Sequence, residues 1–291
     1  MIAVRLNGGL GNQLFQYSFG RGLNQQLNDD LYFYTIGQEK VTEPGPLTHF
    51  KLDIRYLNPD ELGRYNVFPA NVLFQRFERK LLSLFPGINK NIYIETDRNF
   101  HKIRLDSVTC YDGYWQSYKY FSDICDQLKS EIIPVESVKI PSDLSDKMIQ
   151  DESVSIHVRR GDYLSKSNKN IYWTCGGEYY RDAIRYLKTR IKNPVFFVFS
   201  DDITWVKNNF TFLSESPTRF IEHGMAPSDC IDITLMRYCK HYIIANSTFG
   251  WWGAYLGNKN KNSIVIAPKK WYLKDHSFSI RDLIPPEWII I

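Results

Sequence analysis

The stretch IAVRLNGGLGNQL, residues 2–14, opens the chain with a pattern that indicates its architecture. Residues 2–6 form a mostly apolar run of buried-strand type, and a glycine-rich turn follows. Apolar residues then recur at helical spacing over 13–27. A strand, a tight turn and a helix in succession are the unit from which parallel α/β sheets are built.

The same alternation continues along the chain. In the first half we expect strands over 31–35, 92–95 and 108–111, helices over 72–85 and 120–132, and an irregular segment over 37–70. In the second half we expect strands over 154–158, 195–199, 242–245 and 263–267, and helices over 178–191, 203–210, 230–239 and 248–256. Pro134 and Pro141 mark a linker near the middle. We therefore predict an α/β fold with two Rossmann-like domains, 1–140 and 141–291, facing a central cleft; whether the last residues pack back on the first domain stays open.

Composition narrows the classes of function. The chain has 291 residues, of which 43% are hydrophobic and 23% charged, a balance typical of globular proteins. No apolar stretch approaches the roughly 18 residues that span a bilayer, and the first residues lack the features of a signal peptide. Five cysteines without a CxxC pair favour neither a disulfide framework nor a zinc site. Reduced, mostly buried cysteines fit better, so we expect a cytoplasmic location. A net charge of +4 is too weak by itself to indicate nucleic-acid binding.

Two adjacent arginines follow the expected strand 154–158, in the sequence HVRRGD at 157–162. Arg159 and Arg160 would repel each other without an anion, and the planar guanidinium fork suits phosphate oxygens. Asp162 could hold one of them in place, and a purely structural salt-bridge corner is the alternative. The chain contains no Asp-x-Asp triplet with which to hold a cation against a diphosphate, so the arginines offer that positive charge instead.

Polar residues also follow two other strands. Asp201 and Asp202 come directly after 195–199, where a carboxylate could accept from N1–H and N2–H of guanine, or could cap the next helix. Ser247 and Thr248 follow 242–245 and open a helix, so they could cap it or present hydroxyl and N–H groups to phosphate.

The glycine-rich turn over 7–14 permits a close backbone approach, and the following helix N-terminus favours an anion or a sugar hydroxyl. Leu14 stands where a dinucleotide fingerprint would have its third glycine, so that interpretation is weak. A tight turn without a ligand is the other alternative.

Taken together and in order, these segments resemble the bacterial α-1,2-fucosyltransferases of glycosyltransferase family 11. The resemblance is carried by residues 8–17, 113–121, 157–163, 199–205, 239–254 and 286–289. It implies a GT-B-type fold and an inverting transfer of L-fucose from GDP-β-L-fucose to the 2-hydroxyl of a terminal β-galactoside. It also implies that no metal or other cofactor is required, and that the product belongs to a surface polysaccharide such as an O-antigen.

The residues and the resemblance together give a set of expected roles. Catalytic roles are expected for Arg159, Arg160, Asp162 and Asn12. Donor binding is expected for Gly9, Gly11, His157, Arg159, Asp201, Asp202, Asn246, Ser247 and Thr248. Acceptor binding is expected for Trp115, Gln116 and Tyr118. Asp162 is the first candidate for a general base and Glu178 the second, but orienting an arginine explains Asp162 equally well. Tyr118 and Gly250 depart from the family, where Glu and Ser are frequent.

The expected partners are GDP-fucose and a galactose-terminated oligosaccharide, with lipid linkage and peripheral contact with the inner membrane left open. Three alternatives remain. Another inverting sugar transferase would differ in its donor or acceptor. A dinucleotide oxidoreductase would bind NADH at the first turn. A non-catalytic module would bind nucleotide or glycan without transfer.

Overall fold

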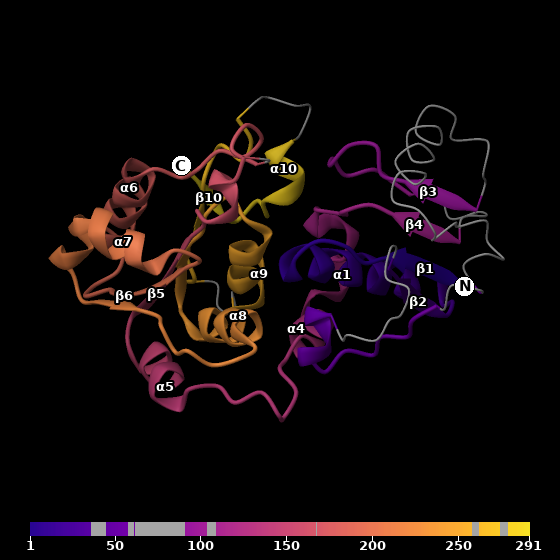
Figure 1. Cartoon of the computed structure of the whole chain (residues 1–291), viewed down its shortest axis with the longest axis horizontal. Coiled ribbons are helices and arrows are strands. Elements are labelled where there is room, and N and C mark those ends of the chain that lie inside the picture. Colours follow the sequence, from indigo (N-terminus) through magenta and orange to yellow (C-terminus); the bar gives the residue numbers. More distant parts are fainter. Residues whose placement is uncertain are drawn as a thin grey trace. The chain divides into compact units, whose positions relative to one another are not determined.

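The computed structural model describes residues 1–35, 45–57, 61, 91–103, 109–166, 168–257, 262–273 and 279–291. Contacts divide the chain into two compact units (Figure 1). Unit 1 comprises Met1–Ile132 and Ser277–Leu283, and unit 2 comprises Ile133–His276 and Ile284–Ile291. Each contains one wholly parallel sheet, which confirms the predicted α/β class.

Unit 1 has a four-stranded sheet in the order β2-β1-β4-β3. Its strands are β1 (Ile2–Arg5), β2 (Leu31–Tyr34), β3 (Ile92–Ile94) and β4 (Cys110–Asp112). Its helices are α1 (Leu10–Leu27), α4 (Cys125–Glu131) and α10 (Ile280–Leu283), with 3-10 turns at Pro46–His49, Tyr118–Tyr120 and Ser122–Ile124. The helix expected over 120–132 is shorter, because Phe121 leaves the helical region with φ −144° while its ring packs in the core. The helix expected over 72–85 and most of the segment 37–70 lie outside the described residues.

Unit 2 has a six-stranded sheet in the order β10-β9-β8-β5-β6-β7. Its strands are β5 (Ser153–Val158), β6 (Val195–Ser200), β7 (Thr218–Phe220), β8 (His241–Ile243), β9 (Val265–Ala267) and β10 (Ile289–Ile290). Its helices are α5 (Ser142–Gln150), α6 (Gly177–Lys188), α7 (Ile203–Asn209), α8 (Ser228–Tyr238) and α9 (Thr248–Gly257), with 3-10 turns at Asp162–Leu164 and Thr211–Glu215. Sequence patterns missed α5, β7, β10 and, in unit 1, α10, since these elements are short or partly exposed.

The centre of unit 2 follows from its most apolar strands. β5 and β6 pair over their whole lengths, from Ser153 opposite Val195 to Val158 opposite Ser200. Helices α8 and α9 pack side by side (Figure 1), and Trp251 and Trp252 on α9 are fully buried, so the Trp pair is core. No helix within the described ranges has the length and apolar character needed to cross a bilayer.

In unit 1, the backbone of α1 at Gly22 lies close to the backbone of Tyr120. A Cβ added at Gly22, on α1, would lie 2.2 Å from the carbonyl oxygen of Tyr120. Only a glycine permits this distance without a shift of the backbone, so Gly22 sets how closely the 118–121 segment packs on α1.

We expect Gly22→Ala to lower the free energy of unfolding by about 1–3 kcal/mol, because the added methyl overpacks the core. Gly177→Ala on α6 is the matched control, since its Cβ would meet only ordinary contacts of 3.6 Å or more. Urea unfolding compares the two variants. Equal stability of Gly22→Ala and the wild type would contradict the close approach.

Candidate functional site

The carboxyl ends of the neighbouring strands β5, β6 and β7 meet around a cavity in unit 2. Its volume is about 350 Å³, within the range of ligand pockets. The lining residues are His157, Arg159, Phe199, Ser200, Asp201, Ile221, Glu222, His223, Gly224, Ser228, Asp229, Asp232 and Phe249. A site at this edge of a parallel sheet is where ligands of α/β proteins bind.

Arg159 is the arginine that faces this cavity. Its Nε donates to Oδ1 of Asp162 at 2.9 Å and lies 3.2 Å from Oδ2 of Asp201. Its two terminal nitrogens donate no hydrogen bond to any side chain or carbonyl in the described ranges, and the side chain is 29% exposed. The carboxylates therefore orient the guanidinium through one edge and leave its forked edge for a ligand.

Arg160 does not line the cavity. Its guanidinium lies 3.7 Å from the ring centre of Trp205, and its Nε is 3.5 Å from Oδ2 of Asp202. Asp202 accepts from the backbone N–H of Trp205 at 3.2 Å and so caps α7. The structure thus separates the two arginines, and the N-cap alternative holds for Asp202.

Asp201 joins two strand ends. Its Oδ1 accepts from the backbone N–H of Arg160 at 2.9 Å, while Oδ2 faces Arg159. A Cβ at Gly161 would lie 2.9 Å from Oδ2, so the absence of a side chain there makes room for the carboxylate. Because both oxygens already have partners, Asp201 is better suited to holding the arginine loop than to reading a base.

His157 is 3% exposed at the end of β5. Its Nδ1 has no hydrogen-bond partner among the described residues, and a Cβ at Gly250 would lie 2.5 Å from that atom. The absence of a side chain at Gly250 therefore makes room for the imidazole. Burial, with a smaller contribution from Arg159, lowers the pKa of His157 to about 3, so the ring is neutral near pH 7.

The corner between β7 and α8 supplies residues that sequence analysis missed. His223 accepts from the backbone N–H of Met225 through Nδ1 at 3.0 Å, and its Nε2 lies 2.9 Å from Oδ1 of Asp232. This arrangement places the proton on Nε2, which donates to Asp232. Burial raises the pKa of Asp232, and its bond to His223 acts in the opposite direction. Gly224 is the feature of the sequence that could have indicated a turn here, and it adopts φ +64° in the structure.

The segment after β8 contains a buried amide side chain. Asn246 is 1% exposed, and its Nδ2 donates to the carbonyls of Trp173 and Trp271 at 2.7 and 2.8 Å. Its Oδ1 accepts from Cys175 at 3.4 Å. The amide thus holds two loop segments together, and a donor contact of Asn246 stays a prediction.

Ser247 is buried, and its hydroxyl accepts from the backbone N–H of Phe249 at 3.3 Å. Thr248 is half-buried and begins α9. Neither residue lines the cavity, although Phe249 next to them does. Phosphate contacts by Ser247 and Thr248 stay a prediction.

The carboxyl edge of the unit 1 sheet gathers the remaining predicted residues. Gln116, after β4, donates from Nε2 to Oδ1 of Asn12 at 2.9 Å. Trp115 is fully buried, and its ring centre lies 4.0 Å from that of Phe19, so the indole is part of the core. Its contact with an acceptor stays a prediction. Tyr118 is half-buried.

Two glycines flank the start of α1. Gly9 is exposed at its N-terminus, whereas Gly11 is buried inside it. In the part of the chain that the structure describes, no group of three or more His, Cys, Asp or Glu side chains is arranged to hold a metal ion.

Replacing His157 by Gln should make the protein less sensitive to acid. The unfolded chain protonates this histidine near its ordinary pKa of about 6.5, whereas the folded protein does so only near about 3. Stability therefore falls as pH drops through that window, because only the unfolded state binds the proton. Melting temperatures between pH 7 and pH 4.5 should decline less in His157→Gln than in the wild type, and parallel declines would contradict the buried neutral ring.

Comparison with known proteins places this geometry in a family. The whole chain, residues 1–291, matches the model of Glycosyl transferase family 11. It is 35% identical to the alpha-1,2-colitosyltransferase of Escherichia coli, covering 100% of this chain and 99% of that protein. It is 29% identical to the O-antigen biosynthesis glycosyltransferase WbnK of Escherichia coli, covering 92% and 93%.

The solved structure of NodZ alpha-1,6-fucosyltransferase soaked with GDP-fucose aligns with a TM-score of 0.51 at 14% identity, covering 88% of this chain and 92% of that one. At this identity the likeness concerns the fold, and it confirms the predicted GT-B-type class. The match of the family model along the entire chain confirms the resemblance found in the sequence. The chain belongs to glycosyltransferase family 11 and is a glycosyltransferase.

Proposed function

We propose that this enzyme transfers L-fucose from GDP-β-L-fucose to the 2-hydroxyl of a terminal β-galactoside, with inversion at the anomeric carbon. The observation that carries the proposal is the cavity in which Arg159 lies among carboxylates at the ends of β5, β6 and β7. The relatives support it, since one is named an alpha-1,2-colitosyltransferase and another an O-antigen glycosyltransferase. The proposed acceptor is a galactose-terminated oligosaccharide of a surface polysaccharide, free or lipid-linked, and the proposed location is the cytoplasm.

The cavity offers one positive group, which suits the diphosphate of GDP, and acidic groups, which suit the N–H donors of guanine. The forked edge of Arg159 suits the diphosphate oxygens. Asp229 and Asp232 on α8 offer acceptors for N1–H and N2–H of guanine, and the bond from His223 holds Asp232 in place. We therefore propose these two carboxylates, rather than Asp201 and Asp202, as the readers of guanine.

The proposed reaction breaks the bond between the anomeric carbon of fucose and the phosphate oxygen. Positive charge grows on the sugar ring and negative charge on the departing GDP, which Arg159 stabilises as it develops. The acceptor hydroxyl forms the new bond from the opposite face and loses its proton as the bond forms. Because Asp162 is bonded to Nε of Arg159, we propose that it orients the arginine rather than acting as a base. The guanidinium of Arg159 would neutralise the diphosphate, a role that a divalent cation has in metal-dependent nucleotide-sugar enzymes. We therefore propose that no metal is required.

The acceptor half of the site is proposed to lie in the first domain. Asn12 and Gln116 form a polar pair at the carboxyl edge of the unit 1 sheet, where a sugar hydroxyl can replace or extend their hydrogen bond. We accordingly propose that residues 1–140 bind the acceptor and residues 141–291 bind the donor.

A second donor is favoured by one observation. The relative that is 35% identical over the entire chain is named for colitose, which is L-fucose without its 3-hydroxyl. Transfer of colitose from its GDP derivative would use the same guanine and diphosphate contacts, so the cavity does not distinguish the two sugars.

A panel of donors and acceptors tests the proposed function. We expect transfer from GDP-fucose to β1,3- or β1,4-linked galactosides with EDTA present, and an α-1,2 linkage in the product by NMR. GDP should raise the melting temperature and UDP should not, because uracil does not offer the paired N1–H and N2–H of guanine. Transfer from GDP-colitose alone would select the second candidate, GDP binding without any transfer would indicate a non-catalytic module, and dependence on added metal would contradict the role of Arg159.

Replacing Arg159 by Ala should lower kcat/KM for the donor by about 100-fold or more, since one donor to a developing anion is worth about 3 kcal/mol. Arg159→Lys should recover little of the loss, because a lysine lacks the fork. Arg185→Ala is the matched control, since Arg185 is exposed on α6 and pairs with Asp182. Wild-type turnover by folded Arg159→Ala would refute the proposed role.

A further inference from the structure

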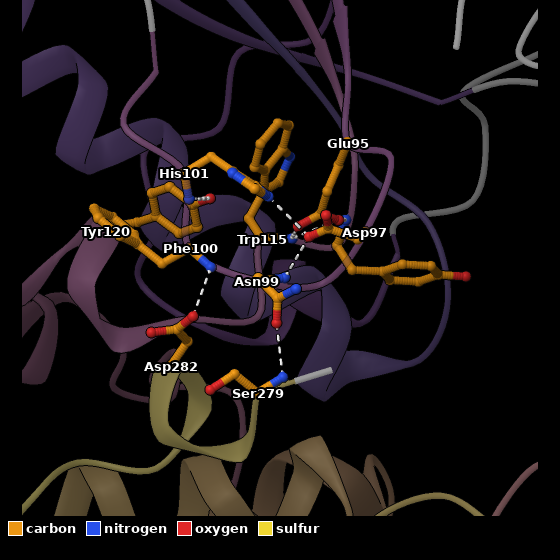
Figure 2. A network of polar contacts seen from close by, with 10 residues as sticks. Glu95, Asp97, Asn99, Phe100, His101, Trp115, Tyr120, Ser279 and Asp282 are labelled. Carbon is orange, nitrogen blue, oxygen red and sulfur yellow. Dashed lines mark hydrogen bonds and ion pairs between the residues drawn. The ribbon is translucent and has the colours of Figure 1, made fainter. Parts of the chain in front are cut away.

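Glu95 is a half-buried acid that none of the proposed catalytic steps uses. It directly follows β3, the neighbour of β4 in the unit 1 sheet, so it lies at the same carboxyl edge as Gln116. Figure 2 shows its side chain pointing toward the backbone of Trp115. Removing a carboxylate from water is costly unless hydrogen bonds compensate for the loss.

The carboxylate of Glu95 binds the backbone rather than a charged side chain. Its Oε2 accepts from the N–H of Tyr114 at 2.6 Å, and its two oxygens lie 3.2 and 3.3 Å from the nitrogen of Trp115. Burial raises the pKa of Glu95 to about 7, although the bonds from Tyr114 and Trp115 act in the opposite direction. The segment that Glu95 binds thus shields part of its side chain from water.

The segment that Glu95 holds has an unfavourable backbone conformation. Trp115 adopts φ +54°, in the left-handed region that large side chains rarely occupy. Its indole is fixed in the core by stacking on Phe19. Such a conformation persists only where the surroundings enforce it. The bonds from Tyr114 and Trp115 to Glu95 supply part of that enforcement.

Gly113 makes this contact possible. A Cβ at Gly113 would lie 2.6 Å from Cβ of Glu95 and 2.8 Å from Cε2 of Trp115. Its carbonyl also accepts from Nε2 of Gln16, on α1, at 3.0 Å. The turn over 113–115 is therefore fixed between β3 and α1.

A second acidic residue, Asp282 on α10, contacts the far end of the same segment, and Figure 2 shows its side chain accepting from Phe100. Its backbone carbonyl accepts from Oγ of Ser117 at 2.6 Å, and its side chain accepts from the N–H of Phe100 at 3.1 Å and pairs with Lys119. Gln116 lies between these two anchors and donates to Asn12. Its orientation therefore depends on both ends of the 113–119 segment.

We propose that Glu95 is a positioning residue for the acceptor: by holding the left-handed turn at Trp115, it presents Gln116 to Asn12 as the polar pair that receives the acceptor's sugar hydroxyls. This inference rests on the proposed function, which places the acceptor at the unit 1 edge. It goes further by assigning a role to an acid that touches neither substrate. Glu95 acts through the backbone of Tyr114 and Trp115, which no motif in the sequence indicates.

The test compares Glu95→Ala, Glu95→Gln, Gln116→Ala and the double variant Glu95→Ala/Gln116→Ala. Glu131→Ala is the matched control, because Glu131 is a half-buried acid of the same unit that bonds Arg21 and Tyr17 instead. Steady-state kinetics give KM and kcat for the acceptor, and the melting-temperature shift with GDP reports donor binding. Hydrogen exchange of a peptide covering 113–117 reports the turn without reference to activity. Should Glu95→Ala not fold, Glu95→Asp replaces it.

We expect Glu95→Ala to lower acceptor kcat/KM at least tenfold, mainly through KM, with an unchanged GDP shift. Glu95→Gln keeps an acceptor oxygen and should stay within about threefold of the wild type. The double variant should be no worse than the poorer single variant, because both changes remove the same arrangement. Exchange over 113–117 should rise in Glu95→Ala and not in Glu131→Ala.

The proposal would be overturned if the loss of acceptor kcat/KM in the double variant equalled the product of the two single losses. Wild-type acceptor kinetics in folded Glu95→Ala would also overturn it. Unchanged exchange over 113–117 would overturn it as well. If the wild type transfers no sugar from any donor, the proposed function fails, and the exchange measurement still decides whether Glu95 holds the turn.

Discussion

The contact between Asp201 and the loop after β5 is the interaction on which the donor site depends. One carboxylate oxygen accepts from the backbone N–H of Arg160, and the other lies 3.2 Å from Nε of Arg159. This contact fixes the end of β6 to the end of β5 and turns the guanidinium of Arg159 toward the cavity. Gly161 makes room for it.

Electrostatics at this corner show why orientation matters more than net charge. The two arginines are accompanied by three carboxylates, Asp162, Asp201 and Asp202, so the cluster as a whole is not positive. The carboxylates approach through Nε, and the terminal nitrogens of Arg159 stay available. A preorganised fork of this kind can stabilise a departing diphosphate without reorganising when charge develops.

Unit 1 uses acids in the same way, as acceptors for backbone N–H groups. Glu95 binds Tyr114 and Trp115, and Asp282 binds Phe100. Tyr114 and Trp115 lie on the loop after β4, which also carries Gln116, whereas Phe100 lies on the loop after β3. In both units, therefore, the acids organise the loops that carry the proposed binding groups.

The sequence predicted those parts of the molecule that depend on local pattern. Strand ends followed by charged residues identified Arg159 and Asp201, and alternation of strands and helices identified the α/β class. It could not predict contacts between distant residues. The amide of Asn246 is consumed by Trp173 and Trp271, and Trp115 is turned into the core; neither fact is visible from residue type.

The missed parts of the site have the same cause. β7 has only three residues, which is too short for a recognisable strand pattern. The sequence therefore did not indicate that His223 and Asp232 follow a strand end. Glu95 meets its partners 19 and 20 residues away along the chain, a relation that spacing does not encode.

A structure of the enzyme with GDP bound tests the central claim most directly. The account predicts a diphosphate oxygen within about 3 Å of a terminal nitrogen of Arg159, with no cation bridging the phosphates. A diphosphate bound away from Arg159, or one whose charge is met by a coordinated metal ion, would contradict it.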